Sequence, residues 1–141
     1  MAPDFLWSDS LVLASALIVH AGEPVALEAA IGEADELLGG TILSFQEMEG
    51  ALARLGAAGH LRYEGGALVP GAESLAFFDG GPARLKRREE KLAEIEGFLR
   101  TGPFVKGTDP RRANEGVAPT PGFDRARFEA AVAAYLGGLH R

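Results

Sequence analysis

The chain of 141 residues contains no cysteine. This absence excludes disulfide bonds, zinc sites with thiolate ligands and cysteine nucleophiles, and it leads us to expect a folded, cytoplasmic protein. Long hydrophobic runs are also missing. The longest, residues 11–19, is about half of the roughly 20 residues that a membrane-spanning helix needs. We therefore expect no membrane segment.

Basic residues are scarce in the first part of the chain. Residues 1–80 carry twelve acidic and only two basic side chains, Arg54 and Arg62, for a net charge of −10. Residues 81–141 carry twelve basic and eight acidic side chains, for a net charge of +4. Because positive charge supplies most non-specific affinity for DNA, the first part is predicted to repel DNA.

Patterns that indicate catalysis or metal binding are missing as well. The histidines at positions 20, 60 and 140 are dispersed, and none forms a pair one helical turn apart that would suggest metal ligands. No serine lies in a nucleophile-elbow pattern, and no phosphate-binding loop is followed by lysine and a hydroxyl residue. We predict no enzymatic activity, no cofactor and no metal site, with an uncharacterised enzyme as a minor alternative.

The pattern of apolar residues and turn formers predicts a compact first domain over residues 1–80. Ser8, Asp9 and Ser10 are suited to cap a helix that follows them. The predicted elements are a helix over residues 11–20 that is apolar nearly all round, a short extended stretch over 24–26, a helix over 27–38, a helix from 45 to about 58, and strands over 61–64 and 67–70 joined by two glycines.

The third predicted helix has the clearest start signal in the chain. Ser44 is followed three residues later by Glu47, which is the pattern of a capping box. In this arrangement each side chain accepts a hydrogen bond from the main chain of the other residue. Leu43 and Met48 are placed to form the accompanying hydrophobic staple.

Residues 44–69, SFQEMEGALARLGAAGHLRYEGGALV, resemble the third helix and wing of winged helix-turn-helix proteins, the superfamily that includes MarR-like and PadR-like bacterial regulators. The resemblance implies a mainly α fold with a small β-hairpin, a winged helix-turn-helix domain followed by C-terminal amphipathic helices. It also implies that Gln46, Glu47, Glu49 and Gly50 face a DNA groove and that residues 62–67 form the wing.

The second part is predicted to comprise a long amphipathic helix within 81–100, a Pro/Gly-rich linker or arm over 101–122, and a C-terminal helix within 123–141. The long helix, over 84–100, would take the place of the dimerisation helix of those regulators. Apolar residues follow each other along it at near-heptad spacing. The candidate residues for self-association are Leu85, Leu92, Ile95 and Leu99.

A basic cluster opens the same helix, at residues 84–88. One interpretation is an ordinary solvated surface in which Lys86 and Arg87 pair with Glu90. The alternatives are contact with the acidic first domain, in the same or a partner subunit, and contact with nucleic-acid phosphates.

Our hypothesis from the sequence is a non-catalytic winged-helix protein, a homodimer that serves as a protein-interaction or regulatory module. The alternative is a DNA-binding transcriptional regulator that uses its basic C-terminal half, including Arg111 and Arg112. The candidate partner-binding residues are Gln46, Glu49, Arg62, Arg84, Lys86, Arg87 and Arg88.

Overall fold

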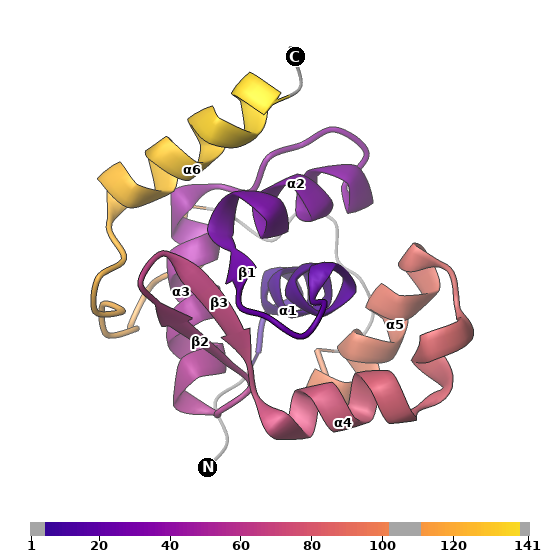
Figure 1. Cartoon of the computed structure of the whole chain (residues 1–141). Coiled ribbons are helices and arrows are strands. Elements are labelled where there is room, and N and C mark those ends of the chain that lie inside the picture. Colours follow the sequence, from indigo (N-terminus) through magenta and orange to yellow (C-terminus); the bar gives the residue numbers. More distant parts are fainter. Residues whose placement is uncertain (1–4, 102–110, 139–141) are drawn as a thin grey trace.

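The computed structural model describes residues 5–101 and 111–138. These residues form a mainly helical fold with a small three-stranded antiparallel sheet (Figure 1). The elements are α1 (Trp7–Val19), β1 (Val25–Ala26), α2 (Leu27–Leu37), α3 (Phe45–Ala57), β2 (Leu61–Glu64), β3 (Ala67–Pro70), α4 (Ala72–Gly80), the 3₁₀ helix η1 (Pro82–Leu85), α5 (Arg88–Leu99) and α6 (Arg125–Gly138). His140 and residues 102–110, part of the predicted linker, lie outside the described residues.

Helix α1 lies in the middle of the molecule, between α2, α3, α5 and the sheet (Figure 1). Residues 11–17 are buried, as the all-round apolar sequence predicts. The predicted start was wrong, because α1 begins at Trp7 and the expected caps Ser8, Asp9 and Ser10 lie inside the helix, fully buried. Asp9 still satisfies the helix start, because the Leu6 N–H donates to its carboxylate at 2.8 Å.

The buried Asp9 carboxylate also accepts two hydrogen bonds from the Arg54 guanidinium of α3, at 2.6 and 2.9 Å. The Asp9 side chain is 0% exposed and the Arg54 side chain 11%. A bidentate pair of this kind has a fixed geometry. It therefore sets the rotation of α3 relative to α1, and it turns the one basic residue of α3 toward the molecule's interior.

The predicted capping box and hairpin are confirmed. The Glu47 N–H donates to the Ser44 hydroxyl at 3.1 Å, and the Ser44 N–H donates to the Glu47 carboxylate at 3.0 Å. Strands β2 and β3 pair antiparallel with Glu64 opposite Ala67. Gly65 and Gly66 make the turn with φ of +57° and +86°, which favours glycine. Strand β1 completes the sheet, in the order β1-β3-β2.

The predicted single helix over 84–100 was wrong. The chain forms α4, which was not predicted, then η1 and an extended step at Lys86 and Arg87 before α5 begins at Arg88. The break keeps three cations out of the first turn of α5, where the helix dipole disfavours them. Glu89 and Glu90 lie in that turn together with Arg88, whose charge is paired with Glu33 and Glu36 of α2.

The break also separates the predicted self-association residues. Ile95 and Leu99 are buried, at 0% and 5% exposure, on a helix that packs against α1. Leu92 is partly buried on the same core, whereas Leu85 of η1 is 93% exposed. The apolar seam of α5 thus belongs to the core of the chain, and the four residues do not form one exposed stripe.

Helix α6 packs against α2 and begins two residues later than predicted. The Tyr135 hydroxyl donates to the Asp35 carboxylate, and this bond raises the pKa of Tyr135 to about 12. A β-carbon on Gly32 would lie 2.7 Å from the Tyr135 ring. Glycine at this position of α2 therefore admits the tyrosine.

His60 connects the turn after α3 to the two following helices. Its Nδ1 lies 3.2 Å from the Ser74 hydroxyl of α4, and its ring packs edge-on to Phe98 of α5 at 5.0 Å. Phe5 packs on it as well, at 5.8 Å. Burial lowers the pKa of His60 below its usual 6.5, although Glu73 acts in the opposite direction. The folded state therefore favours the neutral imidazole.

This environment predicts that acid destabilises the fold through His60. A lowered pKa gives a contribution to stability that is complete above pH 6.5 and is lost as the pH falls from 6.5 through the folded-state pKa. In urea unfolding at pH 7.5 to 5.0, wild type should lose more unfolding free energy than His60→Asn. Burial raises the pKa of Glu96, an opposite effect present in both proteins, so the difference between them isolates His60. Parallel curves would contradict the prediction.

Candidate interaction site on helix α3 and the hairpin

The side of α3 that faces away from the core is covered by the chain's own residues 111–123, here called the strap. Figure 1 shows the strap running along α3 before α6 begins. Ala113 is 1% exposed, and a β-carbon on Gly50 would lie 2.2 Å from the Ala113 carbonyl oxygen. The Asn114 amide donates to the Glu49 carboxylate at 2.7 Å. Glycine at position 50 is thus what allows the strap to lie directly on the helix.

An aromatic cluster holds the far end of the strap. The Phe123 ring stacks on Phe45 of α3 at 5.6 Å and meets Tyr63 of β2 edge-on at 5.4 Å. Phe128 of α6 packs edge-on to Phe45 at 5.9 Å, and the Arg125 guanidinium lies 4.5 Å from the centre of the Phe45 ring. Aromatic pairs contribute roughly 0.5–1.5 kcal/mol each beyond the burial of their area. The strap is therefore fixed to α3 at both ends.

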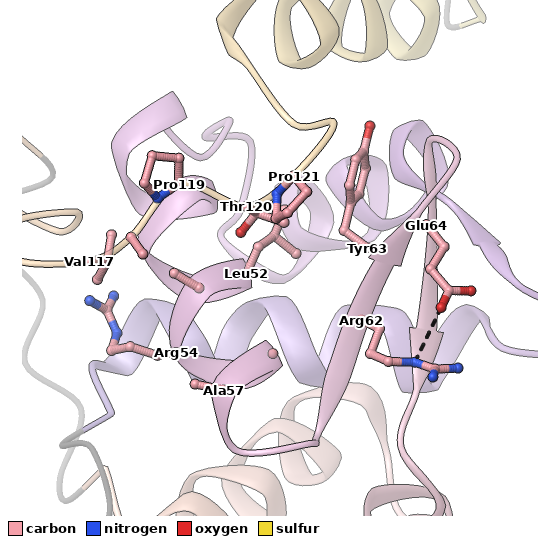
Figure 2. Close-up of a pocket in the computed structure, with 13 residues that line it drawn as sticks. Leu52, Arg54, Ala57, Arg62, Tyr63, Glu64, Val117, Pro119, Thr120 and Pro121 are labelled. Carbon is pink, nitrogen blue, oxygen red and sulfur yellow. Dashed lines mark ion pairs between the residues drawn. The ribbon is translucent and has the colours of Figure 1, made fainter.

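A groove of about 470 Å³ remains between the C-terminal half of α3, strand β2 and the strap (Figure 2). Most of its lining is apolar, and its charges come from Arg54, Arg62 and Glu64. Arg54 forms its ion pair with Asp9, and the Nε atom of the exposed Arg62 lies 3.6 Å from the Oε1 atom of the exposed Glu64. The lining residues are Leu52, Ala53, Arg54, Gly56, Ala57, Arg62, Tyr63, Glu64, Val117, Ala118, Pro119, Thr120 and Pro121.

The residues of α3 that the resemblance assigns to a DNA groove have other contacts here. Glu47 caps the helix, Glu49 accepts from Asn114 and Gly50 lies under Ala113. Gln46 is half-buried. Of the candidate partner-binding residues, only Arg62 lines the groove.

The basic cluster lies elsewhere, at the turn between α4 and α5 (Figure 1). Arg88 reaches across to α2, where its guanidinium pairs with Glu33, at 2.7 Å from Nε, and with Glu36. These hydrogen bonds raise the pKa of Arg88. Lys86 pairs with Glu94, which raises the pKa of Lys86. Arg88 therefore contacts the acidic part of the same chain, residues 1–80, which is one of the three interpretations of the basic cluster.

Arg84 and Arg87 are exposed. The structure therefore separates the candidate residues into two regions. Gln46, Glu49 and Arg62 lie on α3 and the hairpin, and the cations of residues 84–88 lie beyond α4.

Sequence reasoning missed the contacts that define this site. The pair Asp9–Arg54 spans 45 positions, and Gly50 has no local reason to be glycine within a helix. The signals that could have found them are the single arginine among the apolar residues of α3 and the two phenylalanines, Phe123 and Phe128, after the proline-rich segment.

Comparisons with protein-family models, with curated proteins and with solved structures find no match. Within residues 5–101 and 111–138, no three His, Asp or Glu side chains gather in a group that could hold a metal ion. In the same residues, no helix has the length and apolar character needed to cross a membrane.

Gly50→Ala tests the contact between the strap and α3. Alanine favours a helix by about 1 kcal/mol over glycine, but the β-carbon collides with main chain, and overpacking costs about 1–3 kcal/mol. We expect the variant to lose stability and the amides of residues 111–117 to exchange with deuterium about tenfold faster or more.

Gly56→Ala is the matched control. Its β-carbon meets nothing nearer than the Leu61 carbonyl oxygen at 3.6 Å, so it should gain about 0.5–1 kcal/mol with exchange in the strap unchanged. If Gly50→Ala behaved in the same way as Gly56→Ala, the strap would not lie on α3.

Proposed function

We propose that this chain is a non-catalytic winged-helix protein whose work is to bind another protein. The order of elements supports the fold assignment: a helix, a short strand, two helices and a hairpin, with the first strand pairing to the last in the order β1-β3-β2. In a winged helix the third helix and the hairpin form the surface for macromolecules. Here that surface comprises α3, β2, β3 and the groove between them.

The observation that carries the proposal is the position of the strap. DNA reading by a helix of this kind requires its outward residues to enter the major groove. On α3, Ala113 lies on Gly50, Asn114 binds Glu49 and Phe123 stacks on Phe45. What remains open is the apolar groove beside β2. A groove with apolar lining and few charges is suited to a protein segment.

The distribution of charge over residues 1–80 also favours a protein partner over DNA. The two basic residues of the first 80 positions are both paired with carboxylates, Arg54 with Asp9 and Arg62 with Glu64. A duplex brought to α3 and the hairpin would meet an excess of acidic side chains without the cations that anchor its phosphates.

The second candidate function is DNA binding through the basic C-terminal half. The exposed Arg84 and Arg87 favour it. Against it, the neighbouring Arg88 and Lys86 are engaged by three carboxylates, and Arg112 of the strap pairs with Glu115 at 3.3 Å. These ion pairs leave less positive charge to displace counterions from DNA.

A titration with random duplex DNA distinguishes the two functions. Fluorescence anisotropy at about 50 mM salt, where non-specific affinity is greatest, should show no binding by wild type up to about 100 μM protein. Binding that falls steeply with added salt would contradict the proposal. If Arg84→Glu with Arg87→Glu then abolished that binding, the second function would replace the first.

A further inference from the structure

We propose that β2 is a self-association edge, at which two copies of this chain join their sheets through antiparallel pairing of Tyr63 with Tyr63 of the second copy. The inference depends on the sheet edge and not on the proposed function. It concerns a surface different from the predicted stripe on the helix over 84–100.

Strand β2 is an outer strand, because the order in the described sheet is β1-β3-β2. The pairing of β2 with β3 shows which main-chain groups face outward. Gly71 N–H donates to the His60 carbonyl at 2.8 Å, and Glu64 lies opposite Ala67 beside the two-residue turn. Hydrogen-bonded and non-hydrogen-bonded positions alternate along an antiparallel pair. The His60 carbonyl and the main-chain groups of Arg62 and Glu64 therefore bond toward β3, and Leu61 and Tyr63 direct their N–H and C=O groups the other way.

The other side of the sheet gives the same alternation independently. Leu68 lies opposite Tyr63 on β3 and opposite Val25 on β1, and Leu27 N–H donates to the Gly66 carbonyl at 3.3 Å. Leu68 thus bonds to β1, which leaves Tyr63 without a main-chain partner on β3. Apart from the bonds within helices and strands, no main-chain hydrogen bond within residues 5–101 and 111–138 reaches the Tyr63 amide or carbonyl.

The free edge is accessible. Arg62, Tyr63 and Glu64 line the 470 Å³ groove, which lies on the side of β2 away from β3 (Figure 2). The side chains of Arg62 and Glu64 are 62% and 58% exposed. An edge of unpaired N–H and C=O groups is a template for another strand.

The side chains identify that strand as a second copy and select its register. With Tyr63 opposite Tyr63, each Arg62 lies directly across from Glu64 of the other copy, on the solvent face, where opposite charges attract. Two other registers, each displaced by two residues, also bring outward-facing groups together. They place Arg62 against Arg62 or Glu64 against Glu64, and both are repulsive. The sequence Arg62-Tyr63-Glu64 is therefore complementary to itself in one register only.

Charge reversal with mixing tests the pairing on the full chain. Sedimentation at about 100 μM and low salt should show a dimer for wild type. Arg62→Glu places like charges opposite each other twice, as does Glu64→Arg, so each should weaken dimerisation about tenfold or more. Mixing the two variants restores both attractions and should give a heterodimer.

Arg84→Glu provides the control, since it makes the same charge change on an exposed residue away from the edge and should leave the dimer intact. Both edge positions are exposed, so folding is expected to survive, and circular dichroism checks this. A monomeric wild type overturns the proposal. So does a dimer that neither single reversal weakens, or a failure of the two variants to associate on mixing.

Discussion

The arrangement of the whole molecule depends on the buried ion pair between Asp9 and Arg54. One carboxylate caps the start of α1 through the Leu6 amide and accepts two hydrogen bonds from the guanidinium of α3. Neither charge can be left alone in this position, because an unpaired buried ion costs several kcal/mol. The pair therefore permits one orientation of α3 against α1, and the apolar residues of both helices pack around that orientation.

The same orientation determines what the outer side of α3 can do. With Arg54 turned inward, the exposed part of the helix has no cation of its own. Gly50 lies directly beneath the Ala113 carbonyl of the strap, where a side chain would collide with it. Phe45, at the start of the helix, receives Phe123 and Phe128. A helix that resembles a DNA-reading helix in sequence is thus engaged with the rest of its own chain on both sides. The open surface is displaced to the groove and to the outer edge of β2, where main-chain groups and a few charges are available for another polypeptide.

The sequence predicted those features that depend on neighbouring residues. Ser44 and Glu47 are three residues apart, and Gly65-Gly66 closes a hairpin of two short apolar strands, so the capping box and the hairpin could be predicted from local chemistry. The break at Lys86 and Arg87 could not be predicted in this way, because the near-heptad spacing of apolar residues continues from Leu85 to Leu99. In the structure, α5 is oriented so that Ile95 and Leu99 are buried in the core against α1. The break also leaves Arg84, Lys86 and Arg87 outside the N-terminal turn of α5, where the helix dipole disfavours positive charge.

The strap was the feature hardest to foresee. Its prolines indicate an irregular arm, and only the tertiary contacts of Ala113 and Phe123 show that it packs on α3. The inward position of Arg54 could not be predicted either. Its partner Asp9 is 45 positions away, and the local sequence around Asp9 indicates only a helix cap.

A double-mutant cycle on Asp9 and Arg54 tests the central claim most directly. Asp9→Leu and Arg54→Met each leave a buried charge without its partner, and each should lower the unfolding free energy by about 3–5 kcal/mol. The double variant removes both charges and should lose no more than either single one. Additive losses, or single variants that lose less than about 1 kcal/mol, would show that this pair does not hold α3 in place.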